Sequence, residues 1–279
     1  MNMSRARPHY REHALLFLAG VLAAGPAAAQ ERGSVSVAID HATVKLSTVT
    51  YKPAGDGPFP TLIFHHGSGD FDRPYDPRPV AQWFVARGWA VIAASRRGRG
   101  GSQGVDEEGS SCSDAEAAAG ANRALAELEA VTPALIAQPF VDRSRIAIGG
   151  NSRGGILSVA WSGKHPEVRA VVNFVGGWAD SRRCRVGRAI NLSLLKRGVI
   201  WGQPSLWLYG DKDLFYPLED TKANFDAFLA AGGKGVWHDY EPPEAGSLNG
   251  HQINQMPQLW TTDMEAYLAE RGLPSKHGN

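Results

Sequence analysis

The chain has 279 residues, of which 43% are hydrophobic and 20% are charged, and its formal net charge at pH 7 is +1. This balance is typical of one globular domain and excludes a fibrous or mainly disordered chain. A nearly neutral chain also gives little support to nucleic-acid binding.

The N-terminal segment has the layout of a secretory signal peptide. Arginines precede an apolar run from Ala14 to Ala24, and Ala27 and Ala29 fit the small-residue positions of a cleavage site. We expect residues 1–29 to be removed and the mature chain to be periplasmic or secreted. An uncleaved anchor or a buried helix is the alternative. No later segment is long and apolar enough to span a bilayer, so we expect no membrane association after cleavage.

Hydrophobic periodicity then predicts an alternation of strands and helices. Alternating apolar residues between Ser34 and Lys52 predict one or two half-buried antiparallel strands. Compact apolar runs predict buried strands at Thr61–His65, Ala90–Ala94, Ile146–Gly149, Ala170–Phe174, Ser205–Tyr209 and Gly235–Tyr240. Helical spacing predicts helices at Pro79–Arg87, Asp114–Gln138, Gly155–Lys164, Glu219–Ala231 and Met256–Arg271.

This alternation indicates an α/β fold, a doubly wound and mostly parallel sheet with helices on both faces. Ligands of such sheets bind at the carboxyl ends of the strands. We expect a single domain over residues 30–279, in which residues 178–203 are long enough to form a small lid over that edge.

A short glycine-rich motif marks the predicted nucleophile. Gly150-Asn151-Ser152-Arg153-Gly154 matches G-x-S-x-G and lies between a predicted buried strand and a predicted helix. Such a turn holds its serine in a strained conformation with the hydroxyl exposed, and the flanking glycines let strand and helix approach. We therefore predict Ser152 as a nucleophile.

Two phosphate-binding interpretations of the glycine-rich turns fail. Gly150 and Gly155 have the spacing of a P-loop, but Ile156 and Leu157 replace the Lys and Ser/Thr that would contact phosphate and Mg²⁺. The turn that begins at Gly98 has Gln103 in place of the third glycine of a dinucleotide fingerprint.

An activated serine needs a histidine base and a carboxylate, in this fold in the chain order Ser, Asp or Glu, His. Asp213 follows the predicted strand Ser205–Tyr209 and is our candidate, with Asp211 in the same turn as the alternative. His251 follows the last predicted strand and is the candidate base, whereas His238 lies within that strand.

The oxyanion of the reaction needs two fixed donors. The N–H of Arg153, directly after the nucleophile, is one candidate, and the N–H of Ser68, in the loop after Thr61–His65, is the other. His65 and His66 precede Ser68, but adjacent strand residues point to opposite faces and no ligand cluster accompanies them, so we expect structural roles and no metal.

Five motifs in this order resemble the α/β-hydrolase superfamily, and within it the dienelactone-hydrolase-like and prolyl-oligopeptidase-like branches. The resemblance covers Pro60 to about Leu273. The motifs are His66-Gly67-Ser68, the arginine-rich turn 96–102, Gly150–Gly154, Gly210–Asp213 and Gly250-His251. Ser152 stands where dienelactone hydrolases have cysteine, and this length cannot hold the propeller of prolyl oligopeptidases.

The resemblance implies hydrolysis of a carboxylic ester or related acyl bond of a small molecule. Ser152 would attack, His251 would move the proton and Asp213 would orient His251, with no metal or organic cofactor required. A serine peptidase or amidase with the same machinery is the first alternative. A catalytically silent binding protein is the second. The oligomeric state stays open.

Three further features concern specificity and compartment. An arginine cluster predicts recognition of an anionic substrate group, although a solvated basic face explains it equally well. It consists of Arg96, Arg97, Arg99 and Arg153, with four further arginines between 182 and 188. Trp178 could line the acyl pocket or belong to the core. Cys112 and Cys184 could form a disulfide after export or remain two free thiols.

Overall fold

The computed structural model describes residues 29–69, 71–109, 112–244 and 247–276. The predicted signal peptide, apart from Ala29, lies outside these residues. The described chain opens with a hairpin of β1 (Ala29–Ile39) and β2 (Ala42–Lys52), paired antiparallel over their whole length. Asp40 and His41 form its two-residue turn, both with positive φ, a geometry that matches the twist of the strands.

The hairpin joins one eight-stranded sheet of order β1-β2-β4-β3-β5-β6-β7-β8, in which β2 pairs antiparallel with β4 and all later pairs are parallel. The later strands are β3 (Phe59–His65), β4 (Ala90–Ala94), β5 (Val141–Asn151), β6 (Ala170–Phe174), β7 (Ser205–Gly210) and β8 (Gly235–Tyr240). The predicted mostly parallel α/β sheet is confirmed.

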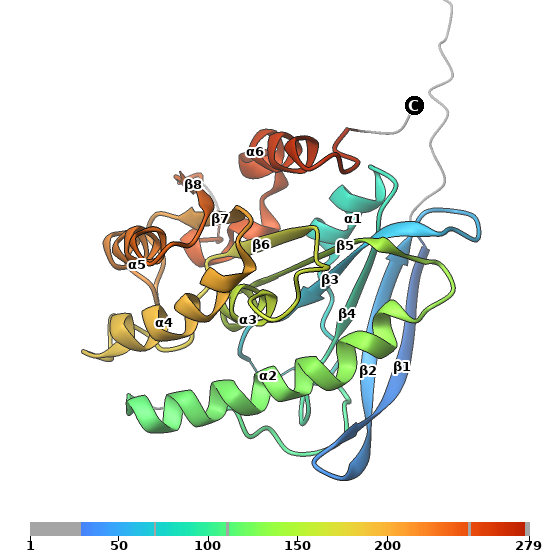
Figure 1. Ribbon diagram of the computed structural model, residues 1–279, viewed down its shortest axis with the longest axis horizontal. Coiled ribbons are helices and arrows are strands. Elements are labelled where there is room, and N and C mark those ends of the chain that lie inside the picture. The colour runs from blue at the N-terminus through green and yellow to red at the C-terminus, as the bar shows by residue number, and fades with distance from the viewer. Residues whose placement is uncertain (1–28, 70, 110–111, 245–246, 277–279) are drawn as a thin grey trace, which may run out of the picture.

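Helices cover both faces of the sheet (Figure 1). One layer holds α1 (Arg78–Val85) and α6 (Pro257–Glu270), and the other holds α2 (Asp114–Ile136), α3 (Arg153–Ser162), α4 (Gly187–Leu195) and α5 (Leu218–Ala230). Two 3₁₀ segments, η1 (Lys196–Trp201) and η2 (Gly250–Gln255), complete the described elements. None of the described helices is long and apolar enough to cross a membrane.

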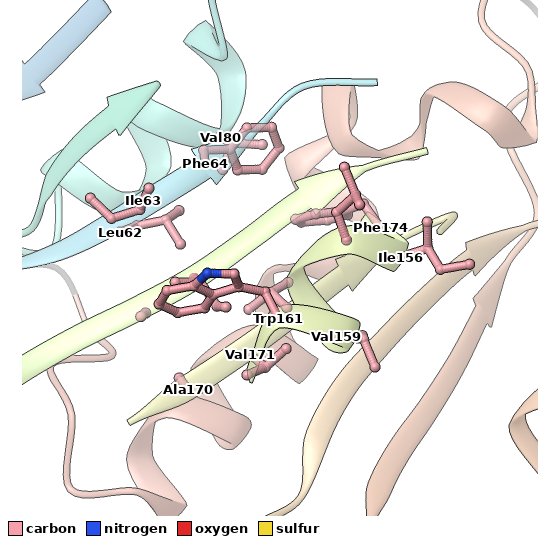
Figure 2. Packing of buried hydrophobic residues seen from close by; sticks show 14 of the residues in the cluster. Leu62, Ile63, Phe64, Val80, Ile156, Val159, Trp161, Ala170, Val171 and Phe174 are labelled. Atoms are coloured by element: carbon pink, nitrogen blue, oxygen red, sulfur yellow. The ribbon is translucent and has the colours of Figure 1, made fainter. Parts of the chain in front are cut away.

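The hydrophobic core lies on both sides of the central strands. Leu62, Ile63 and Phe64 of β3 are at most 1% exposed, which explains their continuous apolar run. Figure 2 shows Ile156, Val159 and Trp161 of α3 with the side chains of β6, and every residue of α3 is buried. A helix buried on all sides holds the residue before it in a fixed position, and here that residue is Ser152.

Most of the segment predicted as a lid serves another purpose. Residues 187–201 form α4 and η1, which connect β6 to β7 and pack against α3 and α5. Ile190, Leu194 and Leu195 of α4 are buried at this contact. The segment is therefore mainly a crossover, and only residues 178–186 form a loop after β6.

Candidate active site

Ser152 lies in a strained turn between β5 and α3. Its backbone has φ of 54° and ψ of −124°, a combination that non-glycine residues adopt only when their surroundings impose it. The surroundings are hydrogen bonds from Ser152 N to Phe174 O at 2.9 Å and from Gly177 N to Ser152 O at 3.2 Å. The neighbouring strand and loop thus fix the turn predicted from G-x-S-x-G.

The two motif glycines are needed because backbone atoms occupy the space of a side chain. A Cβ on Gly150 would lie 2.6 Å from the carbonyl carbon of Gly154, and a Cβ on Gly154 would lie 2.6 Å from the oxygen of His66. Both distances are shorter than a van der Waals contact. The glycines therefore let β5, α3 and the loop after β3 meet beneath Ser152.

The structure brings Asp213 to His251. Oδ2 of Asp213 lies 2.9 Å from Nδ1 of His251, and the carboxylate side chain is 1% exposed. Its Oδ1 accepts the backbone N–H groups of Phe215 at 2.7 Å and Tyr216 at 3.0 Å. Because an ionised carboxylate only accepts, Nδ1 must donate, which leaves Nε2 as the basic nitrogen of the ring.

The alternative residues of the same segments lie elsewhere. Asp211 is exposed, and its N–H donates to Tyr240 O. His238 lies on β8 with Nδ1 3.4 Å from Asp263. The structure thus brings together the two side chains that the chain order predicts, Asp213 and His251.

Facing glycines let the loop of His251 approach the loop of Asp213. A Cβ on Gly210 would lie 2.5 Å from Cα of Gly250, so neither position has room for a side chain. Asn249 then caps η2, accepting the N–H of His251 at 2.8 Å, while Gln252 accepts the N–H of Asn249 at 3.1 Å. This capping box fixes the backbone of His251.

The loop after β3 lies against the other side of the serine. A Cβ on Gly67 would lie 3.0 Å from Cβ of Ser152, so Ser68, the predicted oxyanion donor, follows a direct contact with the nucleophile turn. The second predicted donor, the N–H of Arg153, belongs to the first turn of α3, whose backbone N–H groups favour negative charge.

His65 and His66 have structural roles in this loop. His65 Nδ1 is 2.9 Å from Ser158 Oγ, and burial, with a smaller effect of Arg96, lowers the pKa of His65 to about 3. His66 Nδ1 is 2.6 Å from the oxygen of Gly67, and its Nε2 accepts the N–H of Arg96 at 2.9 Å. Within the described ranges, no group of three or more metal-binding side chains lies together.

Three arginines, one of them next to Ser152 in the chain, surround one buried glutamate. Glu108 Oε1 pairs with Arg96, and its Oε2 lies 3.1 Å from Arg153 and 3.4 Å from Arg99. Burial alone would raise the pKa of Glu108, but the charge and hydrogen bond of Arg96, aided by Arg99, hold it well below 4.5. The cluster therefore stays ionised at neutral pH.

Arg96 and Arg99 also anchor the loop of Ser68, the predicted oxyanion loop. Arg96 Nη1 donates to the oxygen of His66 at 2.8 Å, and Arg96 Nη2 and Arg99 Nη1 donate to the oxygen of Gly67 at 3.3 and 3.4 Å. These bonds hold the two carbonyl groups directly before Ser68. The arginine-rich turn thus supports the backbone of the site.

The structure does not give Arg97 the substrate-binding role that we predicted. Its guanidinium pairs with Asp40 at 2.9 Å, Glu107 at 3.3 Å and Glu127 at 3.2 Å, and its side chain is 12% exposed. Three carboxylates saturate the charge, so Arg97 ties the loop after β4 to α2 and to the hairpin turn. The Arg153 guanidinium is likewise held, by Glu108, by Gly109 O at 2.8 Å and by the ring of Trp178 at 4.3 Å.

Trp178 and both cysteines line a cavity of about 190 Å³ next to Arg153. Trp178 is 4% exposed, and its backbone N–H donates to Oδ1 of Asn191 at 2.8 Å, so it is a core residue that also borders this cavity. The disulfide alternative is not found: Cys112 is an exposed free thiol and Cys184 a buried one. A hydrogen bond with Cys184 raises the pKa of Cys112, which is a contact between two thiols without a covalent bond.

Sequence reasoning missed two residues of the site. Tyr216 contacts Asp213 through its backbone and is 5% exposed, and Glu108 holds the arginine cluster. The signal that could have found Glu108 is the acidic run 106–108, which follows the arginine-rich turn 96–102 within a few residues. Nothing in the pattern distinguished Tyr216 from a loop aromatic.

Comparison with known proteins places this geometry in a family. The family described as X-Pro dipeptidyl-peptidase (S15 family) matches residues 40–202, more than half of the chain. The chain belongs to the S15 family. The family match includes Ser68 and Ser152 but ends before Asp213 and His251, so only the geometry described above supports the predicted acid and base.

Solved structures agree on the fold of this S15 protein. A protein assigned as a dienelactone hydrolase from Klebsiella pneumoniae has a TM-score of 0.57 at 20% identity, covering 87% of this chain and 99% of that one. The Pyrococcus furiosus esterase Pf2001 has a TM-score of 0.61 at 17% identity, covering 86% and 90%. Acetyl xylan esterase 1 from Thermoanaerobacterium has a TM-score of 0.53 at 20% identity, covering 82% and 86%.

No match was found among curated proteins. The family match and the fold together show that this S15 protein is a serine-type hydrolase of the α/β-hydrolase superfamily. Both resemblances drawn from the motifs, to the superfamily and to a serine hydrolase, are confirmed.

Proposed function

We propose that this protein hydrolyses carboxylic esters of small molecules through an acyl-enzyme formed on Ser152. The observation that carries the proposal is that a strained turn after β5 holds Ser152, while the loops after β7 and β8 of the same parallel sheet hold Asp213 and His251 as a pair 2.9 Å apart. A strained turn presents the hydroxyl, and a carboxylate-bound histidine is oriented to remove its proton.

The chemistry follows from the proton positions. His251 Nε2 accepts the proton of Ser152 as Oγ bonds to the ester carbonyl carbon, and Asp213 stabilises the imidazolium through Nδ1. The protonated Nε2 then donates to the departing alcohol. Water attacks the acyl-enzyme by the same route, with His251 as base, and Ser152 is released.

The oxyanion is stabilised by the N–H groups of Ser68 and Arg153. Both belong to segments that cannot move freely, the loop pinned by Arg96 and Arg99 and the first turn of the buried helix α3. Donors fixed before the reaction stabilise developing charge without reorganisation. The positive excess of the surrounding arginine cluster favours the same charge.

An X-Pro dipeptidyl-peptidase is the second candidate, because the family carries that name. A substrate from which a dipeptide is removed has an ammonium group close to the scissile bond, and a carboxylate must recognise it. Around Ser152 the carboxylates are engaged: Glu108 with three arginines and Asp213 with His251. Arginine-rich surroundings disfavour an ammonium group, so the charges support the ester substrate.

The hypothesis of an anionic substrate group loses its main support, because Arg97 and Arg153 are already paired with carboxylates. The esterase names of two structures with this fold, Pf2001 and acetyl xylan esterase 1, support a neutral ester.

The test is hydrolysis by the mature protein of p-nitrophenyl acetate and butyrate beside Ala-Pro-p-nitroanilide, each repeated with Ser152→Ala. We expect ester turnover that falls by about 10³-fold or more in the variant, and little anilide turnover. Anilide turnover above ester turnover would establish the peptidase instead. Equal ester turnover by both proteins would exclude Ser152, and a fluorophosphonate probe that labels neither would favour a binding protein.

We further propose that the protein is exported to the periplasm or secreted after cleavage behind Ala29. The cleavage would leave β1 almost whole, since that strand begins at Ala29. Mass spectrometry of the protein from a bacterial host should give an N-terminus at Gln30 in the exported fraction. An unprocessed chain confined to the cytoplasm would contradict the proposal.

A further inference from the structure

Tyr216 contacts each of the three residues of the proposed triad. Its backbone N–H donates to Oδ1 of Asp213 at 3.0 Å, and its ring centroid lies 5.4 Å from that of His251. Its hydroxyl is within hydrogen-bonding reach of the Ser152 side chain. The side chain is 5% exposed, although it belongs to a loop at the carboxyl end of β7.

The ring lies directly beside the nucleophile turn. A Cβ on Gly177 would be 2.5 Å from Cε1 of Tyr216, so the ring is in contact with the backbone of Gly177. Gly177 in turn donates its N–H to the oxygen of Ser152 at 3.2 Å. These two contacts place the tyrosine ring next to Ser152 without reference to its hydroxyl.

The tyrosine and the oxyanion loop lie on different sides of Ser152. Gly67 approaches Ser152 from β3, whereas Gly177 and Tyr216 approach from β6 and β7. Because β5 lies between β3 and β6 in the sheet, these are its two opposite flanks. A substrate held at Ser152 therefore has the loop of Ser68 on one flank and the tyrosine on the other.

We propose that Tyr216 is a specificity-determining residue that fills the acyl side of the site and restricts the substrate to short acyl groups. The inference rests on the ester hydrolysis proposed above. The carbon attacked by Ser152 carries three other groups. One oxygen faces Ser68 and Arg153, and the leaving group faces His251. The acyl chain takes the remaining side, where the ring of Tyr216 leaves little room.

The hydroxyl of Tyr216 remains a neutral donor at this position. Burial raises its pKa well above the ordinary value, and the interaction with Ser152 only partly offsets the rise. The neutral phenol adds no charge to this side of the site, so the restriction on the acyl group comes from the ring.

The neighbouring residue shows that the leaving-group side is different. Phe215 has its ring centroid 4.7 Å from that of His251, yet it is 40% exposed, and Leu214 is 61% exposed. In the proposed reaction His251 protonates the leaving alcohol. The exposed ring of Phe215 next to His251 therefore offers the alcohol an apolar surface. The substrate class is thus an ester of a short acid with a larger, partly apolar alcohol.

The experiment compares kcat/KM for p-nitrophenyl acetate, butyrate and octanoate. The parent protein should prefer acetate to octanoate by about 10-fold or more, since each methylene that does not fit lowers transition-state binding. Tyr216→Ala should raise the butyrate-to-acetate ratio by about 10-fold, because it removes the ring. Tyr216→Phe is the matched control, because it keeps the ring, and its ratio should stay within about threefold of the parent.

Thermal unfolding of each variant shows whether it is folded, and Tyr216→Leu replaces Tyr216→Ala if the latter is not. Octanoate turnover equal to acetate turnover in the parent would overturn the inference. So would a folded, active Tyr216→Ala or Tyr216→Leu with the parent profile. Absence of ester turnover in the parent would instead overturn the proposed function, a result distinct from a profile that ignores Tyr216.

Discussion

The two flanks of the candidate active site are stabilised by different forces. On the β3 and β4 side, buried charges hold the proposed oxyanion loop, with Glu108 joined to Arg96, Arg99 and Arg153. On the β7 side, the loop of Asp213 depends on two backbone N–H groups and leaves apolar side chains exposed.

The two flanks differ in how readily their side chains can be replaced. Charge networks in a low dielectric are rigid but intolerant of change, because loss of one partner leaves an uncompensated buried charge. In the loop after β7, backbone N–H groups hold the carboxylate of Asp213. Side chains of this loop can therefore be replaced without moving the carboxylate. We infer that the charged flank fixes the loop of Ser68, whereas the loop after β7 combines Asp213, held through the backbone, with exchangeable side chains that set specificity.

The largest effect is expected from the acid itself. Asp213→Asn should lower kcat for p-nitrophenyl acetate by about 10⁴-fold, because the amide stabilises the wrong tautomer of His251. Asp211→Asn, two residues away and exposed, is the control and should change kcat by less than about threefold. Equal losses in both variants would show that the turn, and not the Asp213–His251 pair, matters.

The protein should lose stability when Glu108, the carboxylate shared by the three arginines of the charged flank, is made neutral. Glu108→Gln leaves the buried Arg96 and Arg153 without their counter-charge, while Arg99 keeps Asp106, and should lower the free energy of unfolding in urea by about 3–5 kcal/mol. Glu107→Gln removes a carboxylate that is 49% exposed and should change it by less than about 1 kcal/mol. Similar small losses in both would refute the importance of the cluster.

The stability of the parent should fall in acid for the same reason. The pKa of Glu108 lies below its ordinary value of 4.5, so its stabilisation is complete above that pH and is lost as the pH falls toward the folded value. The difference between the parent and Glu108→Gln in urea unfolding should therefore shrink below pH 4.5. A difference that is constant from pH 7 to about pH 3 would contradict this.

A smaller loss is expected beneath the oxyanion loop. Ser158→Ala removes the hydroxyl 2.9 Å from His65 Nδ1 and should lower the free energy of unfolding by about 1–2 kcal/mol. Ser162 is the control: it is buried in the same helix, but its hydroxyl bonds only to Val159 O. If Ser162→Ala is as destabilising as Ser158→Ala, the bond to His65 contributes nothing specific.

The smallest effect concerns Arg97. Its three carboxylate partners lead us to expect that Arg97→Ala changes kcat/KM for p-nitrophenyl acetate and for mono-p-nitrophenyl succinate in parallel, with a ratio shifted by less than about twofold. A selective loss for the anionic ester would restore the predicted substrate role.

The sequence by itself determined the order of the elements and the identity of the chemical groups. The predicted strands Ala90–Ala94, Ala170–Phe174 and Gly235–Tyr240 agree with the structure to the residue. Buried parallel strands need continuous apolar runs, and a nucleophile turn needs its glycines. Both patterns can be recognised within a short stretch of sequence. The Ser, Asp, His order then follows from the topology of the fold.

Only the tertiary structure distinguished residues of the same type that lie close together in the sequence. Asp211 and Asp213 share one turn, and Arg97 stands between Arg96 and Arg99, yet burial and partners differ because each side chain points to a different neighbour. The crossover formed by α4 and the placement of Tyr216 beside Ser152 depend on contacts between segments far apart in the chain. Distances of that kind have no periodic signal, and packing alone sets them.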